Sequence, residues 1–335
     1  MKSKSASGDN HKRQAWFQIV FGLILLTIAE TLMFLGIEPF ASCFYPFVWW
    51  SYIIIIDGVV YHIQRNSLII NRTREFLVMI PWSVIFWLFF EMTNVRMGNW
   101  HYSNVIDLCW IRWTGYFISF ATVVPGVFET TELLACWGFY SGIATRKRVV
   151  PKSWFFVFYA IGIVSLLLPL IMPRYGFPLI WIGFIFLLEP INYVHRSPSL
   201  LRDWEEGYSR TPLLLLSAGL ICGFLWEFWN YWAATKWIYT LPFFNDPKLF
   251  EMPLAGYLGF PPFAVECYVT YHTFLLLKRL KIWDQRLTHR LASGDSLRWA
   301  VLGVSLLVAL LCTLAFLCID NYTVISFRTV GTPAP

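Results

Sequence analysis

Eight carboxylic acids lie within strongly apolar stretches of this 335-residue chain. They are Glu30, Asp57, Glu91, Glu129, Glu132, Glu189, Glu227 and Glu266. An ionisable group inside a membrane span costs at least ~2.5 kcal/mol, so by default it marks a functional site. We expect these groups to be protonated, because no Lys or Arg is placed deep in the same stretches to form an ion pair. A protonated acid among aromatic rings is suited to protonating a hydrocarbon.

Four of these acids belong to a polar and aromatic pattern that occurs twice. The paired elements are Glu91-x-x-Asn94 with Glu227-x-x-Asn230, Trp100-x-Tyr102 with Trp237-x-Tyr239, Gly115-Tyr116 with Gly256-Tyr257, and Pro125-x-x-x-Glu129 with Pro262-x-x-x-Glu266. Most partners lie about 137 residues apart, and Asp57 and Glu189 form a further pair 132 residues apart. Repetition of this kind indicates an internal duplication.

The positions of the repeated residues suggest separate roles. Glu129 and Glu266 are the candidate acids, since each lies about one turn into a helix that begins at proline. Glu91 with Asn94, and Glu227 with Asn230, have the i, i+3 spacing of one helix face and could relay protons or position water. Aromatic rings stabilise a desolvated cation by up to ~2 kcal/mol. The candidate substrate-binding residues are Asp57, Glu189, Trp100, Tyr102, Trp237 and Tyr239.

Two structural explanations of the same residues stay open. Trp and Tyr gather at membrane interfaces as aromatic belts. Carboxyl and amide groups also join helices, although such a hydrogen bond contributes only ~0.6 kcal/mol on average. Because eight carboxyl groups are many for that purpose, we favour a functional role for Glu91, Glu129, Glu227 and Glu266.

The composition places these residues in a membrane. The chain is 57% hydrophobic and 14% charged, whereas a soluble domain carries roughly 25% charged residues. Apolar stretches long enough to span a membrane are Trp16–Ile37, Phe44–Ile63, Phe76–Val95, Tyr116–Ala144, Trp154–Met172, Phe177–His195, Leu213–Trp232, Gly256–Leu280 and Trp299–Ile319. The sequence therefore predicts an all-α polytopic membrane protein with about nine transmembrane helices.

Basic residues predict the orientation of these spans. With the N-terminus inside, twenty of the 26 Lys and Arg residues fall in inner segments, as the positive-inside rule requires. The C-terminus is then outside. The net charge of +6 is explained by this distribution, and no nucleic-acid partner is expected.

The duplication divides the predicted spans into units. Residues 1–15 form an unstructured cytoplasmic tail, residues 16–144 and 145–280 form two parallel four-helix repeats, and residues 281–335 hold a surface segment, the ninth helix and an outer tail. The loops Arg96–Gly115 and Ala233–Ala255 carry the Trp-x-Tyr motifs, and proline and glycine predict re-entrant or broken-helix backbone in the second. We expect free cysteines, with a Cys43–Cys109 bridge as the alternative.

The two motif regions resemble the short membrane-bound carotenoid enzymes, namely the heterodimeric or fused lycopene cyclases and the related carotenoid hydratases. The segments concerned are Glu91 to Glu129 and Glu227 to Leu254, about a fifth of the chain. The Pro-x-Glu-Glu of the cyclases is absent, since Glu129 follows Pro125 by four residues. The resemblance implies proton-initiated alkene chemistry on a carotenoid or a polycyclic triterpenoid, in a bacterial or archaeal cytoplasmic membrane.

We therefore expect an enzyme that cyclises, isomerises or hydrates a membrane-soluble isoprenoid through a carbocation. A proton-coupled transporter or carrier of a lipophilic substrate is the alternative, since parallel repeats and midplane carboxylates suit it equally. A structural or lipid-binding protein is the third possibility. No metal or other cofactor is expected, because Asp-rich Mg²⁺ motifs, Walker, nucleophile-elbow and H-E-x-x-H patterns are missing from the sequence.

Overall fold

The computed structural model describes residues 2–279 and 294–329, and most of them are helical. The helices are α1 (Lys2–Phe34), α2 (Phe44–Gln64), α3 (Thr73–Met97), α4 (Cys109–Phe120), α5 (Val123–Cys136), α6 (Ser153–Ile171), α7 (Pro173–Gly176), η1 (Phe177–Trp181), α8 (Gly183–Val194), α9 (Leu200–Glu206), α10 (Arg210–Trp232), η2 (Leu254–Gly259), α11 (Phe260–Arg279) and α13 (Gly294–Tyr322). The strands are β1 (Trp100–Ser103), β2 (Val105–Ile106), β3 (Lys236–Tyr239), β4 (Lys248–Leu249), β5 (Met252–Pro253) and β6 (Phe327–Arg328).

Seven helical segments of the described chain are long and apolar enough to cross a membrane. They are Asp9–Phe34, Phe44–Gln64, Thr73–Met97, Cys109–Cys136, Ser153–Ile171, Pro173–Val194 and Arg210–Trp232. They coincide with the first seven predicted spans. The eighth and ninth predicted spans fall on α11 and α13, which are not among the seven, although Leu306–Tyr322 is a shorter apolar helix. The described chain is therefore mostly helical, with seven helical segments that could span a membrane.

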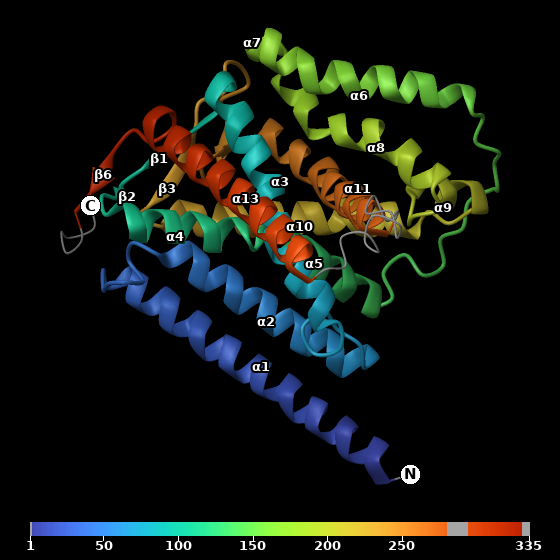
Figure 1. Cartoon of the computed structure of the whole chain (residues 1–335). Helices are drawn as coiled ribbons and strands as arrows, with labels where there is room; N and C mark the ends of the chain where they lie inside the picture. Colours follow the sequence, from blue (N-terminus) through green and yellow to red (C-terminus); the bar gives the residue numbers. More distant parts are fainter. Residues whose placement is uncertain (1, 280–293, 330–335) are drawn as a thin grey trace.

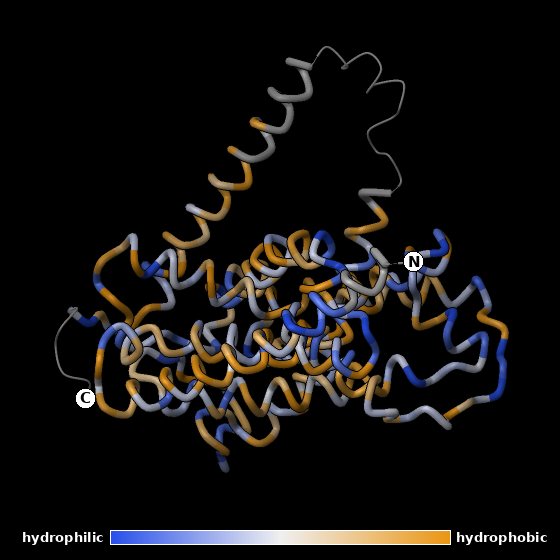
Figure 2. The backbone as a smooth tube through the Cα atoms, turned by 90° about the horizontal axis from the view of Figure 1, so that it is seen from below, coloured by the Kyte–Doolittle hydropathy of each residue, from blue (hydrophilic) through white to orange (hydrophobic). Residues whose placement is uncertain are grey.

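Most of the helices form a bundle that runs between a strand-bearing end and an opposite end that carries α9 (Figure 1), whereas α13 extends obliquely away from the bundle (Figure 2). α1 packs on α2, α2 on α5, α10 on α5 and α11, α8 on α6 and α11, and α13 on α3. The largest apolar core lies between α2, α3, α5, α10 and α11. Figure 2 shows that hydrophilic residues gather in the connections at the α9 end, on the right, whereas the helices are mostly hydrophobic.

The N-terminal segment differs from the prediction. α1 begins at Lys2, so the tail predicted as unstructured over residues 1–15 is helical from residue 2 onward. The apolar part of α1 supplies the nucleus, and extending an existing helix by one residue costs far less than starting a new one. The predicted surface segment over 281–293 lies outside the described residues.

The two loops that carry Trp-x-Tyr contain short strands that the prediction did not include, and β1 pairs with β3 in an antiparallel sheet. After the second loop, the short helix η2 directly precedes α11, where broken-helix backbone was predicted. The all-α prediction therefore misses a small β element at one end of the bundle. Strand pairing between segments so far apart in sequence leaves no local pattern from which it could be recognised.

The C-terminal segment completes this β element. Tyr102 N–H donates to the Thr323 carbonyl at 2.8 Å, Ile325 N–H donates to the Tyr102 carbonyl at 2.8 Å, and β6 pairs in parallel with β2. The end of α13 is tied to α4 by Asp320, which accepts hydrogen bonds from Arg112 at 2.8 and 2.7 Å and from Trp113 at 2.8 Å. The final helix thus holds the strand-bearing end of the bundle.

Candidate functional site

Glu91 is the centre of a polar unit between α3 and β1. Its Oε1 atom accepts hydrogen bonds from Trp87 Nε1 at 2.9 Å, Trp100 Nε1 at 3.3 Å and Tyr102 Oη at 2.5 Å. The residue is fully buried, and its Oε2 atom has no hydrogen-bond partner among the described residues. Burial and the neighbouring Glu91 raise the pKa of the Tyr102 hydroxyl well above its usual range, so this hydroxyl keeps its proton and acts as a donor.

Glu227 is the centre of the corresponding unit between α10 and β3. Its Oε1 atom accepts a hydrogen bond from Tyr239 Oη at 2.8 Å, whereas Trp237 Nε1 donates to Tyr239 Oη at 2.9 Å. Glu227 is fully buried, and its Oε2 atom also has no partner within the described ranges. Burial and Glu227 raise the pKa of the Tyr239 hydroxyl in the same way. The two units share residue types but differ in their donors: three on Glu91 and one on Glu227.

Asn94 and Asn230 hold the two strands by equivalent hydrogen bonds. Asn94 Nδ2 donates to the Trp100 carbonyl at 2.8 Å, and its Oδ1 accepts from Trp100 N–H at 3.2 Å. Asn230 Nδ2 donates to the Trp237 carbonyl at 2.9 Å, and its Oδ1 accepts from Trp237 N–H at 3.0 Å. Both amides are fully buried. Each therefore fixes its strand against the helix that carries the neighbouring Glu.

A mostly apolar cavity of about 180 Å³ lies beside the two units. A water molecule occupies ~30 Å³ in the liquid, so the cavity has room for an organic group. Members of both motif copies line it in pairs: Trp100 and Trp237, Tyr102 and Tyr239, and Gly115 and Gly256. Trp87 and Trp226 lie between the two sides, with ring centroids 5.1 Å apart. All four residues of the two Trp-x-Tyr motifs thus meet at one cavity.

Asp57 and Glu189 lie away from this cavity and bind the loops that follow their own helices. Asp57 accepts hydrogen bonds from Ser67 Oγ at 3.1 Å and Ile69 N–H at 2.7 Å. Glu189 accepts from Ser199 Oγ at 2.5 Å and Leu201 N–H at 2.9 Å. The spacing from carboxyl to hydroxyl is ten residues in both copies, and this shared spacing is a sequence signal that the prediction did not use.

Glu129 and Glu266 are fully buried, but neither lines the cavity. Glu266 Oε1 accepts a hydrogen bond from Phe184 N–H at 2.9 Å, which joins α11 to α8. Glu129 receives no N–H or hydroxyl donor from the described residues, and its carboxyl lies beside that of Asp57. Two carboxyl groups can form a hydrogen bond with each other only if one of them carries a proton.

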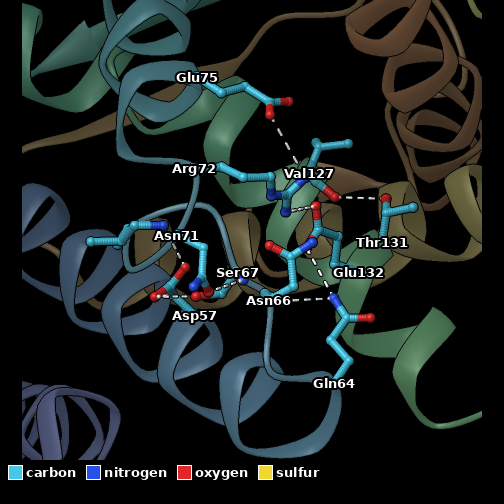
Figure 3. Close-up of polar contacts among 11 residues, drawn as sticks. Asp57, Gln64, Asn66, Ser67, Asn71, Arg72, Glu75, Val127, Thr131 and Glu132 are labelled. Carbon is cyan, nitrogen blue, oxygen red and sulfur yellow. Dashed lines mark hydrogen bonds and ion pairs between the residues drawn. The ribbon is translucent and has the colours of Figure 1, made fainter. Parts of the chain in front are cut away.

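One of the eight acids has a cationic partner, contrary to the expectation from sequence. Arg72 Nη2 forms an ion pair with Glu132, and Arg72 also lies 3.8 Å from Glu75 (Figure 3). Gln64 Nε2 approaches Glu132 at 3.5 Å. Arg72 precedes α3 at the same end of the bundle as Glu132, and its long side chain spans the remaining gap. Glu132 therefore belongs to an inter-helix polar cluster that is separate from the cavity.

The prediction missed several residues that shape the cavity. Tyr45 and Phe177, which lie 132 residues apart like Asp57 and Glu189, both line it. Arg112 lines it as well, with its guanidinium bound to Asp320. Asp320 directly follows the apolar run of the ninth predicted span, so its position at a helix end was a visible but unused signal.

The fold and the site thus define a helical protein with seven described segments that could span a membrane and with an aromatic cavity flanked by two buried carboxyl–tyrosine units. Comparison of the chain with protein-family models, with curated proteins and with solved structures gives no match in any of the three. All inferences about its activity therefore come from the chain itself.

Proposed function

We propose that the protein is a membrane enzyme that protonates a carbon–carbon double bond of a lipophilic isoprenoid, either a carotenoid or a polycyclic triterpenoid. The observation that carries this proposal is the aromatic cavity with Tyr102 and Tyr239 in its wall, each bound to a buried glutamate. Aromatic faces favour a cation by up to ~2 kcal/mol when it is desolvated. The cavity therefore suits a cationic intermediate of an apolar substrate.

The proposed step transfers one proton and leaves no unbalanced charge. The π electron pair of the double bond forms a new C–H bond with the proton of a carboxylic acid, which reaches it through the tyrosine hydroxyl. A cation forms on the adjacent carbon, and the acid becomes a carboxylate. Loss of another proton from the cation gives an isomerised product. If the π pair of a second double bond first forms a C–C bond to the cationic carbon, proton loss from the new cation gives a cyclised product. Capture of water followed by proton loss gives a hydrated one.

The cavity favours Glu91 and Glu227 over Glu129 and Glu266 as the carboxyl groups that exchange protons in this reaction. Of these four glutamates, Glu91 and Glu227 are the two that are hydrogen-bonded, among the described residues, to side chains in the cavity wall. A general acid must lie within hydrogen-bond reach of the reacting group, directly or through one relay. Glu129 and Glu266 instead contact Asp57 and the Phe184 backbone.

We also propose that the chain spans the membrane nine times as two parallel four-helix repeats plus a C-terminal helix, with its N-terminus inside and its C-terminus outside. Equivalent hydrogen bonds of Asn94 and Asn230, and of Asp57 and Glu189, support the repeat relationship. The reciprocal pairing of the two Trp-x-Tyr motifs supports it further. With this orientation the cavity lies toward the outer side.

The test compares lipid extracts from cells that express the protein with extracts from cells that do not, after supplying linear and cyclic isoprenoids. We expect a new isomer, cyclised product or hydrated product. Glu91→Gln and Glu227→Gln should each lower its formation by a factor of ~10² or more. Glu205→Gln is the matched control. Glu205 also accepts a hydrogen bond from a tyrosine, the Tyr193 hydroxyl at 2.8 Å, but it lies on α9, away from the cavity.

Two further variants separate the rival assignments. Glu129→Gln and Glu266→Gln should retain product formation if the cavity glutamates are the acids. An unchanged lipid profile, together with uptake of an isoprenoid that depends on a proton gradient, would instead identify a transporter and contradict the enzyme proposal.

A further inference from the structure

The two carboxyl–tyrosine units are equivalent in residue type but not in hydrogen bonding. Glu91 Oε1 accepts three donors, two indole N–H groups and one phenol, whereas among the described residues Glu227 Oε1 accepts the Tyr239 phenol and the nearby Trp237 indole donates to the Tyr239 oxygen. Donors stabilise the ionised form of a carboxyl and do less for the neutral form. The hydrogen bonds to Glu91 therefore stabilise its ionised form more than the hydrogen bond to Glu227 does.

The distances between phenol and carboxyl oxygens agree with the donor count. Tyr102 Oη lies 2.5 Å from Glu91 Oε1, in the range of a hydrogen bond from a hydroxyl to a charged oxygen. Tyr239 Oη lies 2.8 Å from Glu227 Oε1, as in a bond between neutral groups. The shorter hydrogen bond thus belongs to the carboxyl that has more donors.

The cause of this difference is the position of the indole in each motif. Trp100 donates to the carboxyl of its own unit, and Trp87 adds a second indole donor. Trp237 donates to the Tyr239 oxygen instead. Trp87 lies four residues before Glu91. The residue four before Glu227 is Gly223, so α10 has no indole at the equivalent position.

The charged groups around Glu227 do not change this assignment. Glu251 is the neighbouring carboxylate, and it is paired with Lys236 at 2.7 Å. Among the described residues, neither Glu91 nor Glu227 forms an ion pair. Hydrogen-bond donors, and not cations, therefore distinguish the two carboxyls.

We propose that the units have different tasks in the same reaction: Glu227 holds the proton that is given to the substrate, and Glu91 is the carboxylate that faces the cation and receives the departing proton. This inference rests on the proposed function and deepens it. In the first step the Tyr239 hydroxyl turns from Glu227 Oε1 toward the substrate; its proton forms the new C–H bond while the Glu227 proton moves to the Tyr239 oxygen.

The second step returns the substrate to neutrality. A C–H bond next to the cation breaks, its electron pair forms the new double bond, and the proton passes through Tyr102 to Glu91. The proton then exchanges from Glu91 back to Glu227 through solvent, so that no other reactant is consumed. The net reaction is an isomerisation or a cyclisation.

Infrared difference spectroscopy of the purified full-length protein tests the assignment without any substrate. Glu227→Gln should remove a carboxylic-acid C=O band, whereas Glu91→Gln should remove carboxylate bands and leave the acid band. Tyr239→Phe should shift the same acid band without removing it, which keeps the test usable if Glu227→Gln does not fold. Loss of the acid band in Glu91→Gln, or no change of this band in Glu227→Gln and Tyr239→Phe, would overturn the assignment.

Deuterium exchange tests the proposed roles in the reaction. In D₂O, Glu91→Gln should still place deuterium in recovered substrate while product formation falls ~10²-fold, because protonation by Glu227 is reversible. Glu227→Gln should lose both exchange and product. If the infrared result stands and no isoprenoid changes, the function proposal fails alone; if turnover is found and the acid band belongs to Glu91, the division of tasks fails alone.

Discussion

Tyr102 lies directly opposite Trp237 in the antiparallel pair of β1 and β3, and Trp100 lies opposite Tyr239. Each Trp-x-Tyr motif thus meets the other in reversed order, the arrangement of two copies related by a two-fold axis. The pairing brings both tyrosines into the wall of one cavity. Residues that are 137 positions apart in the sequence therefore act at one place.

The side-chain amides of Asn94 and Asn230, which hold β1 and β3 against their helices, should be important for stability. Asn94→Ala removes both side-chain partners of the buried Trp100 backbone, and Asn230→Ala removes those of the half-buried Trp237 backbone; we expect each to lower the free energy of unfolding by ~1–3 kcal/mol. Asn321→Ala, on the exposed side of α13, is the control and should change it little. Thermal unfolding in detergent measures the effect. Equal stabilities of all three variants would show that the two buried amides do not stabilise the fold.

Asp57 and Glu189 should act as loop anchors. Asp57→Ala leaves Ser67 Oγ and Ile69 N–H without their acceptor, and we expect a loss of ~2 kcal/mol. Asp57→Asn keeps one acceptor oxygen and should lose less. Proteolysis of the segment between α2 and α3 would detect the loosened loop, and a protection pattern identical to that of the unmodified protein would argue against an anchoring role.

The ion pair between Arg112 and Asp320 should hold the final helix. Their side chains are 7% and 11% exposed, and removal of one partner leaves a nearly buried charge. Asp320→Ala should therefore lower stability by ~3 kcal/mol. The double variant with Arg112→Met and Asp320→Leu should recover most of this loss in the same unfolding assay. If the loss of stability in the double variant equals the sum of the losses in Arg112→Met and Asp320→Leu measured singly, the two residues are not coupled.

Filling the cavity should reduce activity without unfolding the protein. A Cβ atom at Gly115 meets no other atom within 4 Å, and this residue lines the cavity. Gly115→Phe should therefore fold, with stability within ~1 kcal/mol because glycine is a poor helix residue, while product formation is lost. Gly303→Phe is the control, since Gly303 is exposed on α13. Full activity of Gly115→Phe would exclude this cavity as the substrate site.

Reporter fusions test the orientation. Fusions after Ser153 and Arg298 should report the inner side, because basic residues flank both positions. Fusions after Asn245 and Pro335 should report the outer side. An inner signal at Asn245 would place the cavity on the opposite side of the membrane from our proposal.

The sequence alone was sufficient to predict apolar helices that could span a membrane and the positions of most of them. Apolar length determines where a helix can span a membrane, because every backbone polar group must be satisfied inside the span. The first seven predicted spans therefore match the seven candidate spans of the structure. The paired motifs were also visible from sequence, since a repeat is a property of the residue order.

The tertiary structure decided which of the repeated residues meet. Glu91 and Glu129 belong to the same repeated pattern, yet only Glu91 binds a tyrosine of the cavity wall, whereas Glu129 lies beside Asp57. The sequence also could not show that Trp100 donates to a carboxyl while Trp237 donates to a phenol. Such contacts depend on side-chain direction and on strand pairing between distant segments, and neither is encoded in local periodicity.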